Sequence, residues 1–355
     1  MRAKLRDAGL IVLKLGTGIL TDRRNRLAAG RVRQLVGQVA RARKAGREVV
    51  VVSSGAVGAG MEALGLERMP ARLEDLQACA AVGQSRLMSV YQELFGEAGL
   101  SVGQVLLTHD DLAHHDRHLN ARNTLMALLE RDVVPIINEN DAVSFTELTV
   151  GDNDRLSALV AALLPADLLV LLTSAEGVMC NYGKRNAKLI STVRKIDDSL
   201  RKQARGTKSR TSIGGMASKI DAADMAVRSG ISVVIASGTQ RGALGKILAG
   251  EVVGTLFLPA KKMKGRKRWI AFFHHPTGAL VVDDGAKAAL RERGKSLLLP
   301  GVAHCEGEFA AGDVVKICDE DGTEFARGIA RAARAEAESG EAAKVVVHRD
   351  DLVIL

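Results

Sequence analysis

The sequence predicts a three-layer α/β fold, in which helices cover both faces of a mostly parallel sheet, followed by a small, mostly-β domain. Two observations predict the larger domain: short apolar runs alternate with helical patterns up to Pro259, and each run is apolar at consecutive positions. Strands of parallel sheets have this pattern because both of their faces are buried. A third observation predicts the smaller domain, since short strands and turns replace the alternation after Pro259.

The alternation can be followed element by element in the first domain. Short runs rich in Leu, Ile and Val are expected to form strands, and apolar residues at helical spacing are expected to form helices. The expected strands are Leu10–Leu15, Glu48–Val52, Val102–Leu107, Val133–Ile137, Leu168–Leu172 and Val233–Ala236. The expected helices are Ala28–Ala45, Leu73–Phe95, Leu119–Glu130, Leu156–Leu164 and Ala217–Ser229.

The C-terminal segment has a different composition. It contains GALVVDDG, GDVVKICDEDGTEFARG and AAKVVVHRDDLVIL, which read as short strands separated by turns, and its length is near the minimum for independent folding. The basic run KKMKGRKR precedes it, and an Ala/Glu-rich stretch near its end, 331–343, is expected to be a loose helix or a mobile loop. We therefore place a first domain at 1–259, a basic linker at 260–274 and a second domain at 275–355.

Composition indicates a cytoplasmic globular protein. The longest apolar run, 156–172, is interrupted by Pro165 and Asp167, so it predicts a helix, a turn and a strand and no membrane span. The four cysteines are scattered without a CxxC pair, as expected in a reducing compartment. The net charge of +9 allows nucleic-acid binding, but only 3% of residues are aromatic, so a solvated basic surface is the simpler expectation.

Three glycine-rich turns are candidate anion sites. KLGTG at 14–18 and SSGAVGAG at 53–60 each follow an apolar strand, and SIGGMASK at 212–219 precedes a helix. Bare backbone amides at a helix start, with lysines nearby, can bind phosphate. Each turn alone could equally be a tight turn beside a surface lysine, and KLGTG lacks the order of a Walker A sequence. Their repetition at strand ends of one sheet favours the anion site.

A polar cluster follows the strand that ends near Ile137. Five carboxylates and three amides lie between Asn138 and Asp154, more than a turn requires. Ligands of such sheets bind at the carboxyl ends of the strands, which is where this cluster is expected. The run HDDLAHHDRH at 109–118 has histidines at helical spacing, but its dense charge fits a solvated loop or helix start better than a metal site.

Together these motifs resemble the glutamate 5-kinase branch of the amino acid kinase family, with its C-terminal PUA domain. The resemblance covers nearly the whole chain, and NENDAV together with GDND is its most specific part. The other matching segments are IVLKLGTGIL, VVVSSGAVGAG, AAVGQSRLM, LNARNTLMALL, GGMASKIDAADMAVRSGI and RKRWIAF, with DDGAKAALRERGKSLLLPGV and FARGIA in the tail. It implies the amino acid kinase fold and ATP-dependent phosphorylation of the side-chain carboxylate of L-glutamate, the first step of proline biosynthesis.

The resemblance also implies a role for individual residues. Lys14 and Lys219 match lysines that stabilise the transferred phosphoryl group, and Asp154 matches the carboxylate that holds both. The substrate-binding positions are Ser54, Asn138, Asp141 and Asn153. The positions that match the ATP site are Lys14, Thr173, Ser174, Ile213, Gly214, Gly215, Met216, Ala217, Ser218 and Lys219. Mg²⁺ is expected to bridge the β- and γ-phosphates, with no protein metal site.

The resemblance implies partners as well: a homo-oligomer (dimer or tetramer), proline as feedback inhibitor, and glutamate-5-semialdehyde dehydrogenase as recipient of the labile product. Two residues depart from the family pattern on the nucleotide side, where Ser174 replaces an acidic residue and Ile213 replaces a threonine. Three alternatives remain open. They are another amino acid kinase (for N-acetylglutamate, aspartate, carbamate or a nucleoside monophosphate), a regulatory protein with a degenerate kinase site, and an RNA-binding protein that uses the PUA-like domain.

Overall fold

The computed structural model describes residues 1–22, 26–143, 152–164, 166–183, 185–205, 215–260, 263, 265–274, 276–339 and 344–355. They form two compact units: Met1–Asp111 with His115–Lys262, and Leu112–His114 with Met263–Leu355. Each unit has its own core of buried apolar side chains. In the described part of the chain, no helix is long and apolar enough to cross a membrane.

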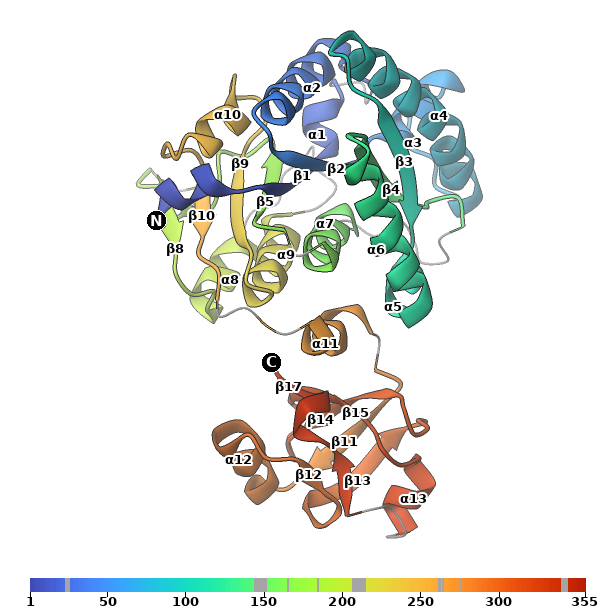
Figure 1. Cartoon of the computed structure of the whole chain (residues 1–355), viewed down its shortest axis with the longest axis vertical. Coiled ribbons are helices and arrows are strands. Elements are labelled where there is room, and N and C mark those ends of the chain that lie inside the picture. Colours follow the sequence, from blue (N-terminus) through green and yellow to red (C-terminus); the bar gives the residue numbers. More distant parts are fainter. Residues whose placement is uncertain are drawn as a thin grey trace. The chain divides into compact units, whose positions relative to one another are not determined.

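The larger unit is built on an eight-stranded sheet with the order β3-β4-β2-β1-β5-β9-β10-β8 (Figure 1). All neighbouring strands are parallel except β9 and β10, so the predicted mostly parallel sheet is confirmed. Sequence reasoning did not anticipate β8 and β10. The strands are β1 Leu10–Leu15, β2 Glu48–Ser53, β3 Val102–Leu107, β4 Val134–Glu139, β5 Leu168–Thr173, β8 Thr192–Val193, β9 Ser232–Ser237 and β10 Thr255–Phe257; the pair β6 Met179–Cys180 and β7 Lys188–Leu189 lies outside this sheet.

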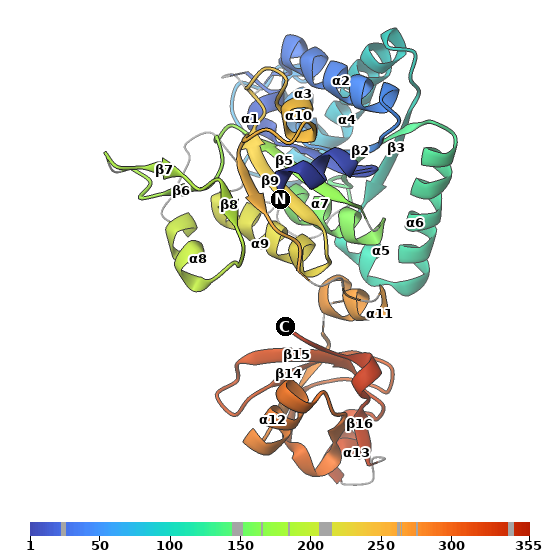
Figure 2. The same cartoon turned by 60° about the vertical axis from the view of Figure 1, so that its left-hand side comes forward.

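Helices cover both faces of the sheet, as Figures 1 and 2 show. Helices α2 and α10 contact each other on one face, and α7 and α9 contact each other on the opposite face. The helices of this unit are α1 Thr17–Leu20, α2 Ala29–Lys44, α3 Ala56–Ala63, α4 Leu73–Glu97, α5 His109–Ala113, α6 His115–Glu130, α7 Asp152–Leu163, α8 Asp198–Arg205, α9 Met216–Arg228 and α10 Ala243–Leu248, after a short 3₁₀ helix at Arg2–Asp7.

The central strand β1 shows how this arrangement places a charged side chain. Ile11, Leu13 and Leu15 belong to the core that includes α2 residues such as Val32. Because successive side chains of a strand point to opposite faces, Lys14 points to the other face, where α7 packs. Lys14 is therefore held near the carboxyl end of the central strand, beneath a helix.

Two boundaries differ from the sequence prediction. Strand β4 continues through Asn138 and Glu139, which pair with Leu106 and Leu107 of β3, so Asn138 lies inside the sheet and not past the end of the strand. The ladder to β3 supplies the backbone hydrogen bonds and so overrides the low strand propensity of Asn. The helix expected at Leu119–Glu130 begins earlier, at His115, so the charged run at 109–118 contains α5 and the start of α6; Asp111 accepts hydrogen bonds there from Thr108 N and Oγ1.

The smaller unit contains a five-stranded sheet with the order β13-β11-β14-β15-β17, which confirms the predicted strand-rich domain. Its strands are β11 Gly278–Val282, β13 Val302–Gly307, β14 Val314–Cys318, β15 Glu324–Ile329 and β17 Leu352–Ile354, with a separate pair β12 Leu297–Leu298 and β16 Val345–Val347. Its helices are α11 Gly265–Arg268, a π-helix at Trp269–Phe273, α12 Asp284–Arg293, α13 Arg334–Ser339, and 3₁₀ turns at Leu299–Gly301 and Arg349–Asp351. The stretch expected to be a loose helix or loop contains α13; its residues 340–343 lie outside the described residues.

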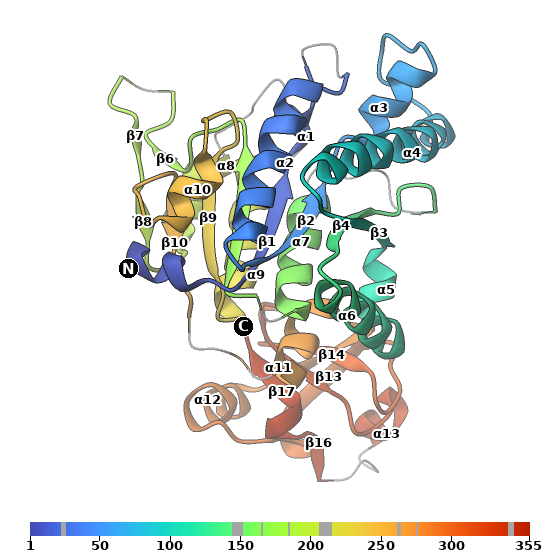
Figure 3. The ribbon, with the colours of Figure 1, turned by 45° about the horizontal axis from the view of Figure 1, so that its top comes forward.

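Helices α3 and α4 cross with their backbones in contact, as two glycines show (Figure 3). A Cβ atom on Gly60 would lie 1.8 Å from the carbonyl oxygen of Cys79, and one on Gly83 would lie 1.8 Å from that of Ala56. Neither obstacle is a flexible side chain, so a methyl group at either position forces the helices apart. This close crossing fixes the start of α3, and therefore the end of β2, against α4.

Gly83→Ala is expected to destabilise the protein by about 3 kcal/mol, the upper part of the range for overpacking a core. Gly96→Ala is the matched control, because Gly96 lies in the same helix and nothing occupies the space of its Cβ within 4 Å. That substitution should be neutral or slightly stabilising, since alanine has the better helix propensity. Urea denaturation of both variants checks this, and equal stabilities would mean that the helices do not cross as described.

Candidate active site

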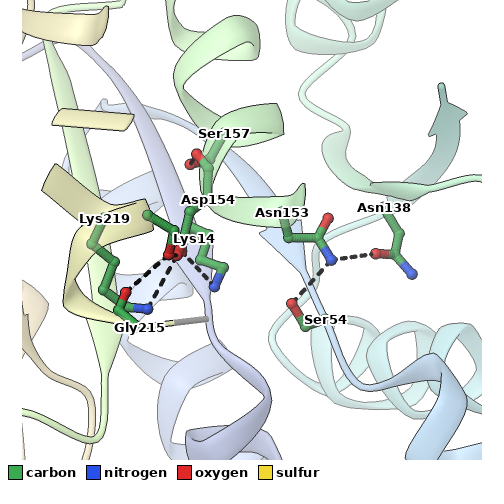
Figure 4. Close-up of polar contacts among 9 residues, drawn as sticks. Lys14, Ser54, Asn138, Asn153, Asp154, Ser157, Gly215 and Lys219 are labelled. Atoms are coloured by element: carbon green, nitrogen blue, oxygen red, sulfur yellow. Dashed lines mark hydrogen bonds and ion pairs between the residues drawn. The ribbon is translucent and has the colours of Figure 1, made fainter. Parts of the chain in front are cut away.

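The carboxylate of Asp154 is the centre of the first polar cluster. Asp154 is in the first turn of α7 and is 1% exposed. Its Oδ1 lies 2.8 Å from Lys14 Nζ, and its Oδ2 lies 3.1 Å from Lys219 Nζ (Figure 4). The two lysines come from β1 and α9 and are themselves buried. Three segments far apart in the sequence therefore meet at one carboxylate.

The start of α9 adds a further hydrogen bond to this carboxylate. The Ser218 hydroxyl donates to Asp154 Oδ2 at 2.8 Å and lies 2.9 Å from the carbonyl oxygen of Gly215, the N-cap residue. Lys219 follows in the same turn and is 4% exposed. A lysine at a helix N-terminus opposes the helix dipole, so its position here depends on the carboxylate that it contacts.

Burial and charge act in opposite directions on the pKa values of this cluster. Burial alone would raise the pKa of Asp154, but Lys14, Lys219 and the Ser218 hydrogen bond outweigh it and hold that pKa below its ordinary value. Burial lowers the pKa of Lys219, although the attraction of Asp154 opposes this effect. The cluster thus holds two amines against one carboxylate, an excess of positive charge that suits a phosphate.

A second polar cluster adjoins the first, because Asn153 precedes Asp154 on α7. Asn153 Nδ2 donates to Ser54 Oγ at 3.0 Å and to Asn138 Oδ1 at 3.0 Å, so Asn153 lies between the ends of β2 and β4 (Figure 4). Asn138 Nδ2 in turn donates to Oε1 of Gln84 on α4 at 2.9 Å. Four uncharged polar side chains, from α4, β4, α7 and the residue after β2, form one connected row.

Ser54 is held in place by the backbone around it. Its amide donates to Leu15 O at 3.2 Å, which joins the end of β2 to the end of β1. The hydroxyl oxygen of the preceding residue, Ser53 Oγ, lies 2.7 Å from the hydroxyl oxygen of Tyr91 on α4. Gly55 then adopts φ 103°, a left-handed conformation that favours glycine, and α3 begins directly after it.

The structure places most of the residues predicted for the site at this edge of the sheet. Lys14, Ser54, Asn138, Asn153, Asp154, Ser218 and Lys219 make the contacts given above, and Gly215, Met216 and Ala217 form the start of α9. Asp141 is half-buried in the turn after β4. Thr173 is buried at the end of β5, and Ser174 after it is exposed. Ile213 and Gly214 lie outside the described residues.

Sequence reasoning missed Gln84 and gave the histidine run no role. Gln84 carries a weak signal, a polar side chain directly after the packing glycine Gly83 of α4. In the histidine run, Asp111 caps α5 and pairs with Arg117. Within the described ranges, no group of three or more His, Cys, Asp or Glu side chains could hold a metal ion.

Comparison with known proteins identifies both halves of the chain. Residues 9–237 match the amino acid kinase family, and residues 278–350 match the PUA domain. The chain is 44% identical to the glutamate 5-kinase of Enterobacter sp. (strain 638), with 98% of this chain and 99% of that protein aligned. Identity and coverage are the same for the glutamate 5-kinase of Shigella flexneri.

Solved structures support the same fold. The carbamate kinase from Giardia lamblia bound to AMP-PNP is 18% identical and superposes with a TM-score of 0.54, covering 72% of this chain and all of that one. At that identity the match supports the fold alone, whereas the curated relatives match over nearly the full length. The chain therefore belongs to the amino acid kinase family, among the glutamate 5-kinases that carry a C-terminal PUA domain.

Proposed function

We propose that this protein transfers the γ-phosphoryl group of ATP to the side-chain carboxylate of L-glutamate, producing L-glutamyl 5-phosphate for proline biosynthesis. The observation that carries the proposal is the Asp154 carboxylate, bonded to Lys14 and Lys219 beside a row of uncharged polar groups. The lysines supply positive charge for a phosphoryl group, and the row supplies hydrogen bonds for a small polar acceptor. The curated relatives named above support glutamate as that acceptor.

The reaction does not require the protein to remove a proton from the acceptor. A glutamate side chain has an ordinary pKa of about 4.3, so the attacking carboxylate is already ionised at neutral pH and needs no general base. The difficulty is to bring two anions together and to stabilise charge on the equatorial oxygens of the transferred group. In this proposal Lys14 and Lys219 provide that stabilisation, and Asp154 holds them apart and oriented toward the incoming phosphate.

The nucleotide would bind at the starts of α7 and α9 and the end of β5, where Thr173 and the Gly215–Lys219 turn lie. Mg²⁺ would neutralise phosphate charge. Both oxygens of Asp154 are already engaged by lysines, and the described residues include no metal-binding cluster, so its ligands would come mainly from ATP itself.

Three further properties remain proposals drawn from the family. They are assembly into a homo-oligomer, inhibition by proline, and delivery of the labile acyl phosphate to glutamate-5-semialdehyde dehydrogenase. All the contacts of the candidate site lie within the larger unit. We therefore propose a regulatory or architectural role for the PUA domain.

Hydroxylamine traps an acyl phosphate as a hydroxamate, so the purified protein should form hydroxamate only when both ATP and glutamate are present. In the same assay, Lys219→Ala should lower kcat about 10²- to 10³-fold, the usual cost of losing one donor to transition-state charge. The glutamate KM should change much less, because this contact strengthens as charge moves. Lys202→Ala, at an exposed position on α8, is the control. Near-normal turnover of Lys219→Ala would remove Lys219 from the mechanism.

Asp141 is proposed to pair with the α-ammonium of glutamate, because it is half-buried in the turn that follows Asn138. Asp141→Asn keeps the shape of the side chain and removes its charge, which should reduce kcat/KM for glutamate at least roughly tenfold. Glutarate lacks the ammonium, so its reaction should be affected far less. Steady-state rates with both acceptors test this pairing; a parallel decrease for glutamate and glutarate would give Asp141 a structural role only.

A further inference from the structure

Gln84 ends the row of polar side chains that begins at Ser54, and part of its amide is unused. Its Oε1 accepts the hydrogen bond from Asn138 Nδ2 at 2.9 Å. Its Nε2 is buried and has no hydrogen-bond partner among the residues described, while the side chain as a whole is 8% exposed. A buried amide nitrogen without an acceptor is unfavourable, so this group is expected to have a partner that belongs to a ligand.

Asn153, which lies between Ser54 and Asn138 in the row, has the complementary property. Asn153 Oδ1 is also buried without a hydrogen-bond partner in the described part of the chain, although its Nδ2 donates twice. The row therefore offers an acceptor at Asn153 and a donor at Gln84. An α-amino acid presents the matching groups, because its ammonium donates hydrogen bonds and its carboxylate accepts them.

The order of contacts indicates which carboxylate Gln84 would meet. The reacting carboxylate has to lie at the lysines, which contact Asp154, and Asn153 is the next residue to Asp154. Gln84 is two hydrogen bonds further along, beyond Asn138. We propose that Gln84 Nε2 donates to the α-carboxylate of glutamate, which makes Gln84 a specificity-determining residue. This inference rests on the proposed function and adds a binding residue to it.

Two substitutions separate this role from mere support of Asn138. Gln84→Met keeps the length of the side chain and removes both polar atoms. Gln84→Glu keeps the acceptor for Asn138 but replaces the free amide with a carboxylate oxygen. If Gln84 only supports Asn138, Gln84→Glu should impair the enzyme less than Gln84→Met. If Gln84 faces a substrate carboxylate, Gln84→Glu should impair it more, because like charges then meet in a buried site.

We expect Gln84→Met to raise the glutamate KM about tenfold through the lost hydrogen bond, and Gln84→Glu to raise it at least about tenfold more. The KM for ATP and kcat should change much less. Lowering the pH should restore glutamate binding to Gln84→Glu selectively, as the introduced carboxyl group is protonated and becomes a donor. Gln92→Glu, at an exposed position on the same helix, controls for added charge on α4.

Thermal melting tests whether each variant is folded. If Gln84→Met does not fold, the pH response of the glutamate KM of Gln84→Glu still tests whether Gln84 faces a substrate carboxylate. A glutamate KM for Gln84→Glu within about twofold of the unmodified protein, or below that of Gln84→Met, would overturn the proposal. So would a raised KM that does not recover at low pH. Failure of the kinase proposal itself is distinguishable, because the unmodified protein would then form no hydroxamate.

Discussion

The buried carboxylate of Asp154 is the interaction on which the site depends. Two lysines that are almost fully enclosed need a compensating charge, and Asp154 is the carboxylate that contacts both. Without it, β1, α7 and α9 would meet around two buried cations that repel each other. With it, the same three elements hold their ammonium groups at fixed positions, which preorganises positive charge before any phosphate arrives.

The first turn of α7 divides the site into two chemical halves. Consecutive residues of a helix point in directions about 100° apart, so Asn153 and Asp154 serve different neighbours. Asp154 reaches the charged groups of β1 and α9, and Asn153 reaches the uncharged groups of β2 and β4. One helix start therefore contacts both the two lysines and the uncharged polar row.

Much of this could be predicted from the sequence, for identifiable reasons. The strands are strongly apolar, and the motifs NENDAV and GDND are specific, so the fold and the residues Lys14, Asp154 and Lys219 were anticipated together. Their mutual contacts were implied by the family resemblance alone. Asn138 was expected just past the end of a strand that stops at Ile137, whereas pairing with β3 keeps it in the sheet. Gln84 was missed because its contact with Asn138 joins α4 and β4, which are far apart in the sequence.

The pH dependence of stability in Asp154→Asn tests the account most directly. Removing one partner of a buried ion pair should cost about 3–5 kcal/mol at pH 7. Burial already lowers the pKa of Lys219, and without Asp154 nothing opposes that effect, so the folded variant loses this proton at lower pH. The unfolded chain then binds more protons than the folded one, and the stability of the variant rises with pH. Denaturation should thus show that the variant has a lower free energy of unfolding than the unmodified protein, and that this difference becomes smaller toward alkaline pH. A small difference, or one independent of pH, would contradict the central role of Asp154.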